Sequence, residues 1–269
     1  MDINAQNRMY KTDEGSRLAV EELVPVVRRY LGRTKHPRIL EVGCGFGRNI
    51  EALSSIPGAD VYGCDFSNVE LKKARERLDE LKRTNVTLVH QKNENRLPFD
   101  DDSFDAIVCW QVLEHVLSRE TKKRLIGEMV RVLKSGGFIL IETPNFWFPV
   151  DYHDNRMLFV HWLLPTRARH ALTTLVRNED FPPSQYTSIY ELRRMLRRSQ
   201  YVRSFKQRTC IYFEERYSDV FRHMGGTNVL LKKIFFAMYY LFYLALRLFG
   251  LKGDLFTPSV RVVFQVRKV

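Results

Sequence analysis

The chain has 269 residues, of which 45% are hydrophobic and 28% are charged, as is ordinary for a folded soluble protein with a sizeable core. Its four cysteines contain no C-x-x-C pair, which argues against a zinc or disulfide framework and fits a reducing cytoplasm; they are Cys44, Cys64, Cys109 and Cys210. The first residues, MDINAQNRMYKTDEGSR, have no apolar stretch of the kind that a signal peptide needs.

The net charge of +12 is unevenly distributed along the chain. Residues 1–150 hold 23 Lys and Arg against 22 Asp and Glu, whereas residues 151–269 hold 20 against 9. We therefore expect the second half to meet an anionic partner, such as membrane lipid, nucleic acid or a phosphorylated substrate.

The first half predicts strands that alternate with helices. The expected strands are 38–42, 60–65, 86–90, 104–110 and 138–142, the last entered through the turn Gly136-Gly137. The expected helices are 16–31 with Ser16 as N-cap, one beginning near Gly47, one that reaches about residue 83 from a capping box of Ser67 and Glu70, and 120–133. This alternation is typical of an open parallel sheet covered on both faces, which binds ligands beyond the carboxyl ends of its strands.

The second half, beyond Pro144, is less regular. It predicts a basic helix at 188–199, a strand at 203–213, a strongly apolar stretch at 229–251 and a final edge strand at 259–268.

The first strand ends in a glycine-rich loop, Glu41-Val-Gly-Cys-Gly-Phe-Gly47. Closely spaced glycines let a backbone approach a ligand closely. A dinucleotide site needs G-x-G-x-x-G, but here the third glycine comes one position early and Arg48 stands where that pattern has glycine. The loop is thus a poor match to pyrophosphate binding, and no P-loop lysine is present, which argues against nucleotide hydrolysis.

Asp65 ends the second strand, 18 residues after Gly47. A carboxylate at this place can accept hydrogen bonds from both hydroxyls of a ribose, and Phe66 beside it can lie against a purine. Alone, Asp65 would be read as a turn residue. Together with the glycine loop at this distance, it is predicted to be a ribose ligand.

Four consecutive motifs, ILEVGCGFGRNI, GCDFS, LPFDDDSFDAIVCWQVLEHV and LKSGGFILIETPN, resemble class I S-adenosylmethionine-dependent methyltransferases, in the branch that includes ubiquinone- and polyketide-type O-methyltransferases. The resemblance covers residues 36–145, and the basic helix also matches. It implies an α/β fold with a doubly wound, mostly parallel seven-stranded sheet, helices on both faces, and an added apolar and basic helical region in the C-terminal half. The chain then divides into an N-terminal helical cap (1–35), a cofactor-binding core (36–145) and an acceptor-side region (146–269).

The resemblance also implies which residues bind S-adenosylmethionine. They follow the first four strands: Glu41, Gly43, Gly45, Gly47, Asp65, Phe66, Asn93, Trp110 and Gln111. In this assignment the glycines form the cofactor loop, Asp65 holds the ribose, Phe66 packs on adenine, and Trp110 and Gln111 lie beneath the methionine portion. Asn93 stands where the family usually has an Asp that accepts from the adenine amino group, a bond that an amide oxygen can still accept.

Methyl transfer to a hydroxyl needs a group that removes a proton, and His is the natural choice near neutral pH. His115, just after the fourth strand, is the first candidate, although Glu114 and His115 could instead fix the strand–helix turn. His153 lies among polar residues after the fifth strand and is the second candidate, as a base or an acceptor ligand. His161 lies in an apolar run, which favours a packing role.

We expect no metal ion in this site. Small-RNA 2′-O-methyltransferases resemble this stretch and hold a divalent ion with E-x-x-E-H and a later His. Here Gln111 replaces the first carboxylate of that motif, and the charge of a hard-cation site is thereby reduced. Quinone-type relatives can also use a metal, so metal assistance stays the alternative.

The 13 residues between Lys233 and Arg247 carry no charge. As a helix they reach ~20 Å, short of the ~30 Å hydrocarbon core, so we expect this helix to lie in the membrane interface with its basic ends near lipid phosphates. A second membrane candidate is 157–164, followed by Arg167, Arg169 and Arg177. The alternative is that both apolar stretches pack on each other or form a homodimer interface.

The sequence therefore predicts a cytoplasmic methyltransferase, peripheral on the inner face of the membrane, that O-methylates a lipid, a quinone precursor or a lipid-linked sugar. The rival is an RNA 2′-O-methyltransferase, which the basic half would also suit, but which should interleave basic residues with exposed aromatics. A non-catalytic protein that binds an adenosyl ligand is the third reading.

Overall fold

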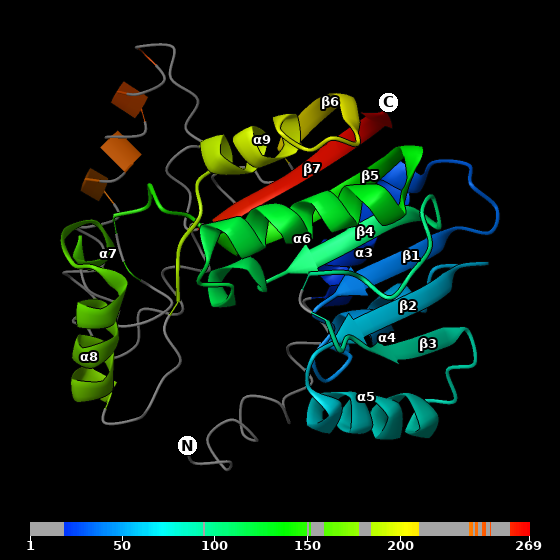
Figure 1. Cartoon of the computed structure of the whole chain (residues 1–269). Coiled ribbons are helices and arrows are strands. Elements are labelled where there is room, and N and C mark those ends of the chain that lie inside the picture. The colour runs from blue at the N-terminus through cyan, green and yellow to red at the C-terminus, as the bar shows by residue number, and fades with distance from the viewer. Residues whose placement is uncertain are drawn as a thin grey trace.

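The computed structural model describes residues 19–93, 95–149, 151, 159–177, 184–209, 237–238, 240–241, 244–245, 248 and 259–269. Seven strands form one sheet in the order β3-β2-β1-β4-β5-β7-β6 (Figure 1). Their bounds are β1 (Arg38–Val42), β2 (Asp60–Asp65), β3 (Val86–His90), β4 (Phe104–Trp110), β5 (Leu133–Pro144), β6 (Val202–Thr209) and β7 (Ser259–Lys268). β1 to β5 pair in parallel and β7 pairs antiparallel to β5 and β6, which confirms the mostly parallel seven-stranded sheet.

The prediction of an edge strand at 259–268 is wrong, because β7 lies between β5 and β6 and the edge strand is β6. The alternating pattern arises from Arg261, which is buried, and from polar residues near the end of β7. Val262 and Phe264 face one core and Val263 faces the other, so helices cover both faces of this strand.

β5 begins at Leu133 rather than at Phe138. Leu133 pairs with Phe104 and Phe138 pairs with Ala106, so the residues between them bulge out of the ladder. The expected glycine turn lies within this bulge: Gly136 has a φ of 91°, and a Cβ on Gly137 would lie 2.7 Å from the Asp105 carbonyl oxygen.

Helices cover both faces of the sheet (Figure 1). One core lies under α6 (Arg119–Val132) and α9 (Ile189–Arg197). The other lies under η1 (Ala19–Leu23), α3 (Val24–Leu31), α4 (Arg48–Leu53) and α5 (Asn68–Glu80). A short turn η2 (Leu113–His115) follows β4, and α7 (Val160–Leu163) and α8 (Thr166–Arg177) lie beyond the carboxyl ends of the strands.

The predicted helix ends need small corrections. α5 ends at Glu80 rather than near residue 83, because Lys82 adopts a left-handed φ of 51°. α9 ends at Arg197, before the predicted Ser199. The first helix is described only from Ala19, so the predicted cap Ser16 lies outside the described residues.

α9 begins with a capping box in which the Ser188 hydroxyl accepts from the Glu191 N–H and the Glu191 carboxylate accepts from the Ser188 N–H. Ser188→Ala should therefore lower the free energy of unfolding by about 1 kcal/mol, since one orphan N–H loses its acceptor. Urea denaturation measures this change. Ser204→Ala on exposed β6 is the control and should leave the stability unchanged; equal stability of both variants would refute the role of the cap.

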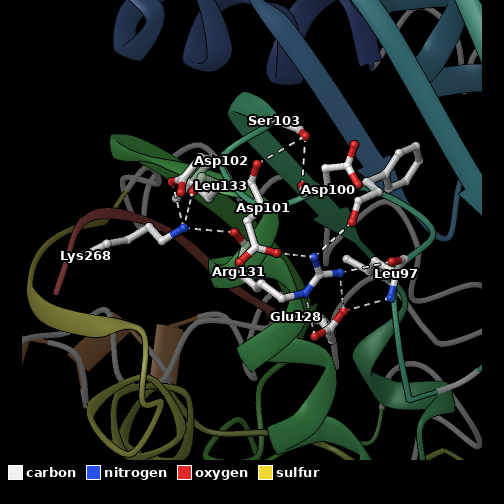
Figure 2. Close-up of polar contacts among 10 residues, drawn as sticks. Leu97, Asp100, Asp101, Asp102, Ser103, Glu128, Arg131, Leu133 and Lys268 are labelled. Atoms are coloured by element: carbon white, nitrogen blue, oxygen red, sulfur yellow. Dashed lines mark hydrogen bonds and ion pairs between the residues drawn. The ribbon is translucent and has the colours of Figure 1, made fainter.

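A buried arginine forms several polar contacts at the edge of the sheet where the parallel strands begin (Figure 2). Arg131 in the last turn of α6 pairs with Glu128 at 2.6 Å and with Asp101 at 2.7 Å, and it donates to two carbonyls of the loop before β4. Lys268 of β7 pairs with Asp102 of the same loop at 2.7 Å. The acidic run in LPFDDDSFD thus anchors the loop to α6 and β7, at the opposite edge from the carboxyl ends of the parallel strands.

No helix within the described ranges is long and apolar enough to cross a membrane. Most of the predicted apolar helix 229–251 lies outside the described residues. Its described positions are helical, and Met238, Leu241 and Leu248 among them are exposed. The predicted division at residues 35 and 145 stays a prediction.

Candidate active site

The glycine loop after β1 meets the loop after β4 at the point where the strand order reverses. Gly43, Gly45 and Gly47 have φ values of 73°, 48° and 78°, which other residues adopt only with strain. A Cβ on Gly43 would lie 2.4 Å from Val112 Cγ2, just after β4. The crevice of such a sheet opens between these two loops, so the glycines are required where a ligand would approach.

Asp65 holds the glycine loop from the neighbouring strand. Its carboxylate accepts from the Gly45 N–H at 2.9 Å through Oδ2 and from the Ser67 N–H at 2.9 Å through Oδ1. Asp65 therefore points toward the loop and fixes it to the start of α5. Each carboxylate oxygen has a further lone pair with which it can accept another hydrogen bond.

Glu41 is buried beneath the loop, at 1% exposure. Its Oε1 accepts from Asn49 Nδ2 at 2.7 Å, whereas its Oε2 has no hydrogen-bond partner among the described residues. Burial raises the pKa of this carboxyl to about 8, an effect that the Asn49 hydrogen bond opposes and the Asp65 charge increases. A buried oxygen without a donor is costly, which points to a missing cationic or N–H partner from a ligand.

A third carboxylate lies beside the same loop. Glu70 Oε2 is 3.3 Å from the Cβ position of Gly45, and desolvation, followed by the charge of Asp65, raises the pKa of Glu70. With Glu41 and Asp65 it gives the crevice a negative character. The charge of Lys73, which lies over the Phe46 ring of the loop at 5.0 Å, opposes this rise in the pKa of Glu70. Sequence reasoning assigned Glu70 only to the capping box.

The predicted adenine contacts lie after β2 and β3. The Phe66 side chain is 52% exposed, and its carbonyl contacts His90 Nε2 at 3.0 Å. Asn93 is exposed, and its Oδ1 accepts from the Asn95 N–H at 2.8 Å. Gln91, which the sequence analysis missed, is buried and donates from Nε2 to the Asn93 carbonyl at 3.2 Å.

Trp110 and Gln111 end β4. Gln111 has a left-handed φ of 55°, and its N–H donates to the Glu142 carbonyl at 2.9 Å. The Arg261 guanidinium lies 4.4 Å from the centre of the Trp110 ring. Arg261 is also paired with Glu142 at 2.9 Å and with Glu22 of η1 at 2.5 Å.

This network was also missed, although an arginine inside the apolar run SVRVVFQV is a sequence signal for it. It joins four elements, η1, β4, β5 and β7, through one buried guanidinium. The network therefore holds η1 against the sheet beside the crevice. Trp110 packs against the Arg261 guanidinium, whose charge is compensated by Glu22 and Glu142.

The histidines have different environments. His115 is exposed at the end of η2, just beyond β4. His161 is 5% exposed, its Nε2 contacts the Phe146 carbonyl at 3.0 Å, and burial lowers its pKa, which confirms the predicted packing role. His153 lies outside the described residues.

A buried polar cluster supports the region after β5. Asp151 accepts from the Tyr186 hydroxyl and pairs with Arg169 of α8 at 3.8 Å. Arg169 also donates to the Ser184 carbonyl. The expectation that Arg169 flanks a membrane segment is therefore wrong, since its guanidinium is buried with an internal carboxylate.

Lys122 of α6 joins the same region to the core. Its Nζ donates to the Gln185 carbonyl at 2.7 Å and to the Thr187 hydroxyl at 2.9 Å. Burial lowers its pKa to about 8. The segment before α9 is thus held firmly against α6.

An exposed apolar surface follows β5 at the edge of the sheet where the parallel strands end, which is also the edge of the glycine loop. It consists of large side chains that are each at least 36% exposed: Trp147, Phe159, Trp162, Leu163 and Leu164. The ring centres of Phe159 and Trp162 are 5.2 Å apart, and Trp162 donates to the Phe146 carbonyl, so these rings are held in place. We call this set the aromatic surface.

Within the described part of the chain, no group of three or more His, Cys, Asp or Glu side chains could hold a metal ion. The described cysteines Cys44, Cys64 and Cys109 are free and buried, and burial raises their pKa values. Cys210 lies outside the described residues.

Comparison with known proteins identifies the kind of domain. The sequence model of a family described as a methyltransferase domain matches residues 39–137. The chain is 40% identical over 114 residues to demethylmenaquinone methyltransferase of Shouchella clausii (strain KSM-K16), across 41% of this chain and 47% of that protein. It is 29% identical over 151 residues to a tRNA N(3)-cytidine methyltransferase of Gallus gallus, across 52% of this chain and 40% of that protein.

The chain thus spans less than half the length of these two relatives. Among solved structures, an S-adenosylmethionine-dependent methyltransferase from Mesorhizobium loti aligns with a TM-score of 0.56 over 90% of this chain and 96% of that chain. The identity is 16%, so this similarity supports the fold alone.

Proposed function

We propose that this chain, which belongs to the class I S-adenosylmethionine-dependent methyltransferases, transfers a methyl group to a hydroxyl of a membrane-resident acceptor. S-adenosylmethionine is the cofactor of this family. The observation that carries the proposal is the buried Glu41 oxygen, which has no donor among the described residues and lies beside a glycine loop bordered by the carboxylates of Asp65 and Glu70. An adenosine that bears a sulfonium and an ammonium group, and no phosphate, matches this electrostatic character.

In this proposal each crevice residue contacts a different part of the cofactor. The backbone of Gly43, Gly45 and Gly47 lies against it, and the free oxygen of Glu41 accepts from its ammonium group. Asp65 accepts from the ribose hydroxyls while it keeps its bonds to the loop.

The remaining contacts come from the neighbouring strand ends. Phe66 covers adenine with the exposed face of its ring, and Asn93 accepts from the adenine amino group. Trp110 and Gln111 support the methionine portion, with Trp110 held from behind by Arg261.

For the acceptor, the protein must align a hydroxyl oxygen with the methyl group and remove the hydroxyl proton. When bound, S-adenosylmethionine would supply a methyl group that its sulfonium activates for transfer to that oxygen. We propose His115 and His153 as the groups that take the proton, since each follows a strand whose carboxyl end borders the crevice. A positioned base of this kind contributes typically ~10²–10⁴-fold in rate.

The aromatic surface favours a lipid, a quinone precursor or a lipid-linked sugar as the acceptor. It follows β5 directly, and five exposed apolar side chains of this size suit contact with a membrane interface, where Trp is favoured. The name of the Shouchella relative points in the same direction. The corresponding location is the inner face of the membrane, with the protein peripheral and cytoplasmic.

A pair of variants tests the membrane contact. Trp162→Ser with Leu163→Ser should weaken binding to phosphatidylglycerol vesicles by roughly tenfold or more in a flotation assay. The reason is that two exposed apolar side chains, which are proposed to enter the membrane interface, are lost. Val69→Ser with Leu81→Ser, exposed apolar residues near the two ends of α5, is the control and should bind normally. If wild-type protein stays in the soluble fraction at low salt, the membrane assignment is wrong.

The activity itself is tested by cofactor titration and product analysis. Calorimetry should detect S-adenosylmethionine binding, and lipid extracts from cells with the gene should contain a species that carries one methyl group more than its counterpart in cells without it. Binding without any methylated product would favour the non-catalytic alternative. A methylated RNA in place of a lipid would favour the class to which the Gallus relative belongs.

A further inference from the structure

We propose that α9 and the start of β6 form a binding site for the phosphate groups of anionic lipid headgroups, separate from the cofactor crevice. Residues 188–209 contain seven Lys and Arg against one Glu. Two adjoining hollows open here. One is lined by Tyr190, Arg193, Arg194, Arg197 and Arg198, and the other by Arg197 with residues 202–205.

The arginines are presented on a fixed scaffold. Leu192, Met195 and Leu196 of the same helix are buried in the core with α6, and the capping box fixes the helix start. The opposite side of α9 therefore faces solvent in one orientation, and its guanidinium groups need no folding step before they meet a ligand.

Most of the charge of this site has no counter-ion among the residues that the structure describes, and Arg193 donates only to the neutral Gln207 amide. No ion pair involves Arg194, Arg197 or Arg198 among the residues that the structure describes. Glu191, the one acidic residue of the helix, is paired with Arg119 at 3.3 Å. Arg194 and Arg198 are one helical turn apart, a like-charge spacing that destabilises a helix unless an anion lies between the two groups.

Two structural explanations account for only part of this charge. Basic residues in the last turn of a helix offset its dipole, which covers Arg194, Arg197 and the C-cap residue Arg198 but not Arg193. Charged residues on an edge strand discourage pairing with other sheets, which covers Arg203 and Lys206 of β6. Neither explanation accounts for the fact that basic residues of α9 and of β6 line two adjoining hollows that share Arg197.

Phosphate is the ligand chemistry that fits several converging guanidinium groups, because each can donate two parallel hydrogen bonds to phosphate oxygens. We commit to lipid headgroups as the source, which rests on the proposed membrane location. Exposed aromatics do not alternate with the arginines as stacking of unpaired bases would require. Tyr190 is the single aromatic that lines the larger hollow and Phe205 the single one that lines the smaller, and the other exposed rings of the described residues, Phe66, Trp147, Phe159, Trp162 and Tyr240, belong to other parts of the chain.

The test removes three charges without touching the crevice. Arg194→Gln with Arg197→Gln and Arg198→Gln should weaken binding to vesicles of phosphatidylglycerol in phosphatidylcholine by roughly 100-fold, at about fivefold for each arginine. The matched control, Arg28→Gln with Arg29→Gln and Arg33→Gln, removes the same charge from exposed positions on and after α3 and should bind within about twofold of wild type. Unchanged circular dichroism and unchanged S-adenosylmethionine affinity establish that both variants are folded.

Three results would overturn the proposal. The first is equal vesicle binding by the α9 variant and wild type. The second is an arginine-dependent rise of Tm in inorganic phosphate without vesicle binding, which would make free phosphate the ligand. The third is tighter arginine-dependent binding of a single-stranded RNA than of vesicles. Vesicle binding does not require methyl transfer, so it can be detected even if the methylation assays find no product. The headgroup site on α9 and the proposed methyltransferase activity can therefore be refuted independently.

Discussion

Gly43→Ala is expected to weaken S-adenosylmethionine binding by on the order of 100- to 1,000-fold, the largest effect of a single methyl group in this protein. Two penalties combine at this position. The φ of 73° is strained for any residue with a Cβ, and that Cβ would overlap Val112 Cγ2 at 2.4 Å. The loop after β1 and the loop after β4 must then separate, which displaces both walls of the crevice. Calorimetric titration measures the loss directly.

The control for this prediction is Gly127→Ala in α6. A Cβ there finds no atom closer than 4.0 Å, and glycine is a poor residue for a helix interior. This variant should gain roughly 0.5–1 kcal/mol of stability and keep its cofactor affinity. Full cofactor affinity in folded Gly43→Ala would show that the glycine loop is not the ligand-binding loop.

Glu41→Gln is expected to weaken cofactor binding by on the order of 100-fold near pH 8 and to abolish the decline of affinity at lower pH. The pKa of Glu41 is raised to about 8, chiefly by burial. A cationic ligand binds the ionised carboxylate, so below pH 8 binding must first release the proton from Glu41. Wild-type affinity should therefore fall by up to roughly tenfold for each pH unit below that pKa, and it should fall again above about pH 8 as the α-ammonium group of the ligand loses its proton.

The groups around Glu41 support this assignment. Asn49 from α4 donates to it, and Asp65 and Cys44 contribute no positive charge that would keep it ionised without ligand. Calorimetry in buffers of different ionisation enthalpy should detect one proton released on binding near pH 7 in wild type and none in Glu41→Gln. The control Glu76→Gln, on the exposed side of α5, should match wild type. An affinity of wild type that does not change between pH 6 and 8 would contradict the prediction.

The ligand-free protein provides an independent measurement of the same group. Because the folded-state pKa of Glu41 lies above its ordinary value of 4.5, the contribution of this carboxyl to stability is complete below pH 4.5 and is lost as the pH rises toward 8. The free energy of unfolding of wild type should decline through this window. Glu41→Gln should lack that part of the decline.

Local patterns were sufficient for the elements that carry the crevice. β1, β2, β3 and β4 have the bounds that their apolar runs predict, because each is a short buried strand closed by glycine or polar residues. The glycine loop and Asp65 could be located because their function depends on backbone freedom and on position at a strand end, and both are local properties. The same is true of the capped start of α9.

The tertiary structure alone decided which distant groups meet. The Arg261 network joins residues of η1, β5 and β7, and the alternation that suggested an edge strand at 259–268 is the signature of this buried charge. Arg169 likewise read as a membrane-flanking cation until Asp151 and Tyr186 were found against it.

The sequence by itself determined the strands of the core, the loop that approaches the ligand and the uneven charge of the two halves. Only the tertiary structure decided the burial of Glu41, whose Oε2 has no donor in the described part of the chain, the place of β7 inside the sheet and the arginines of α9 that line one hollow. The physical reason is that strand and loop propensities act between near neighbours, whereas burial, ion pairing and pKa shifts depend on residues that only folding brings together.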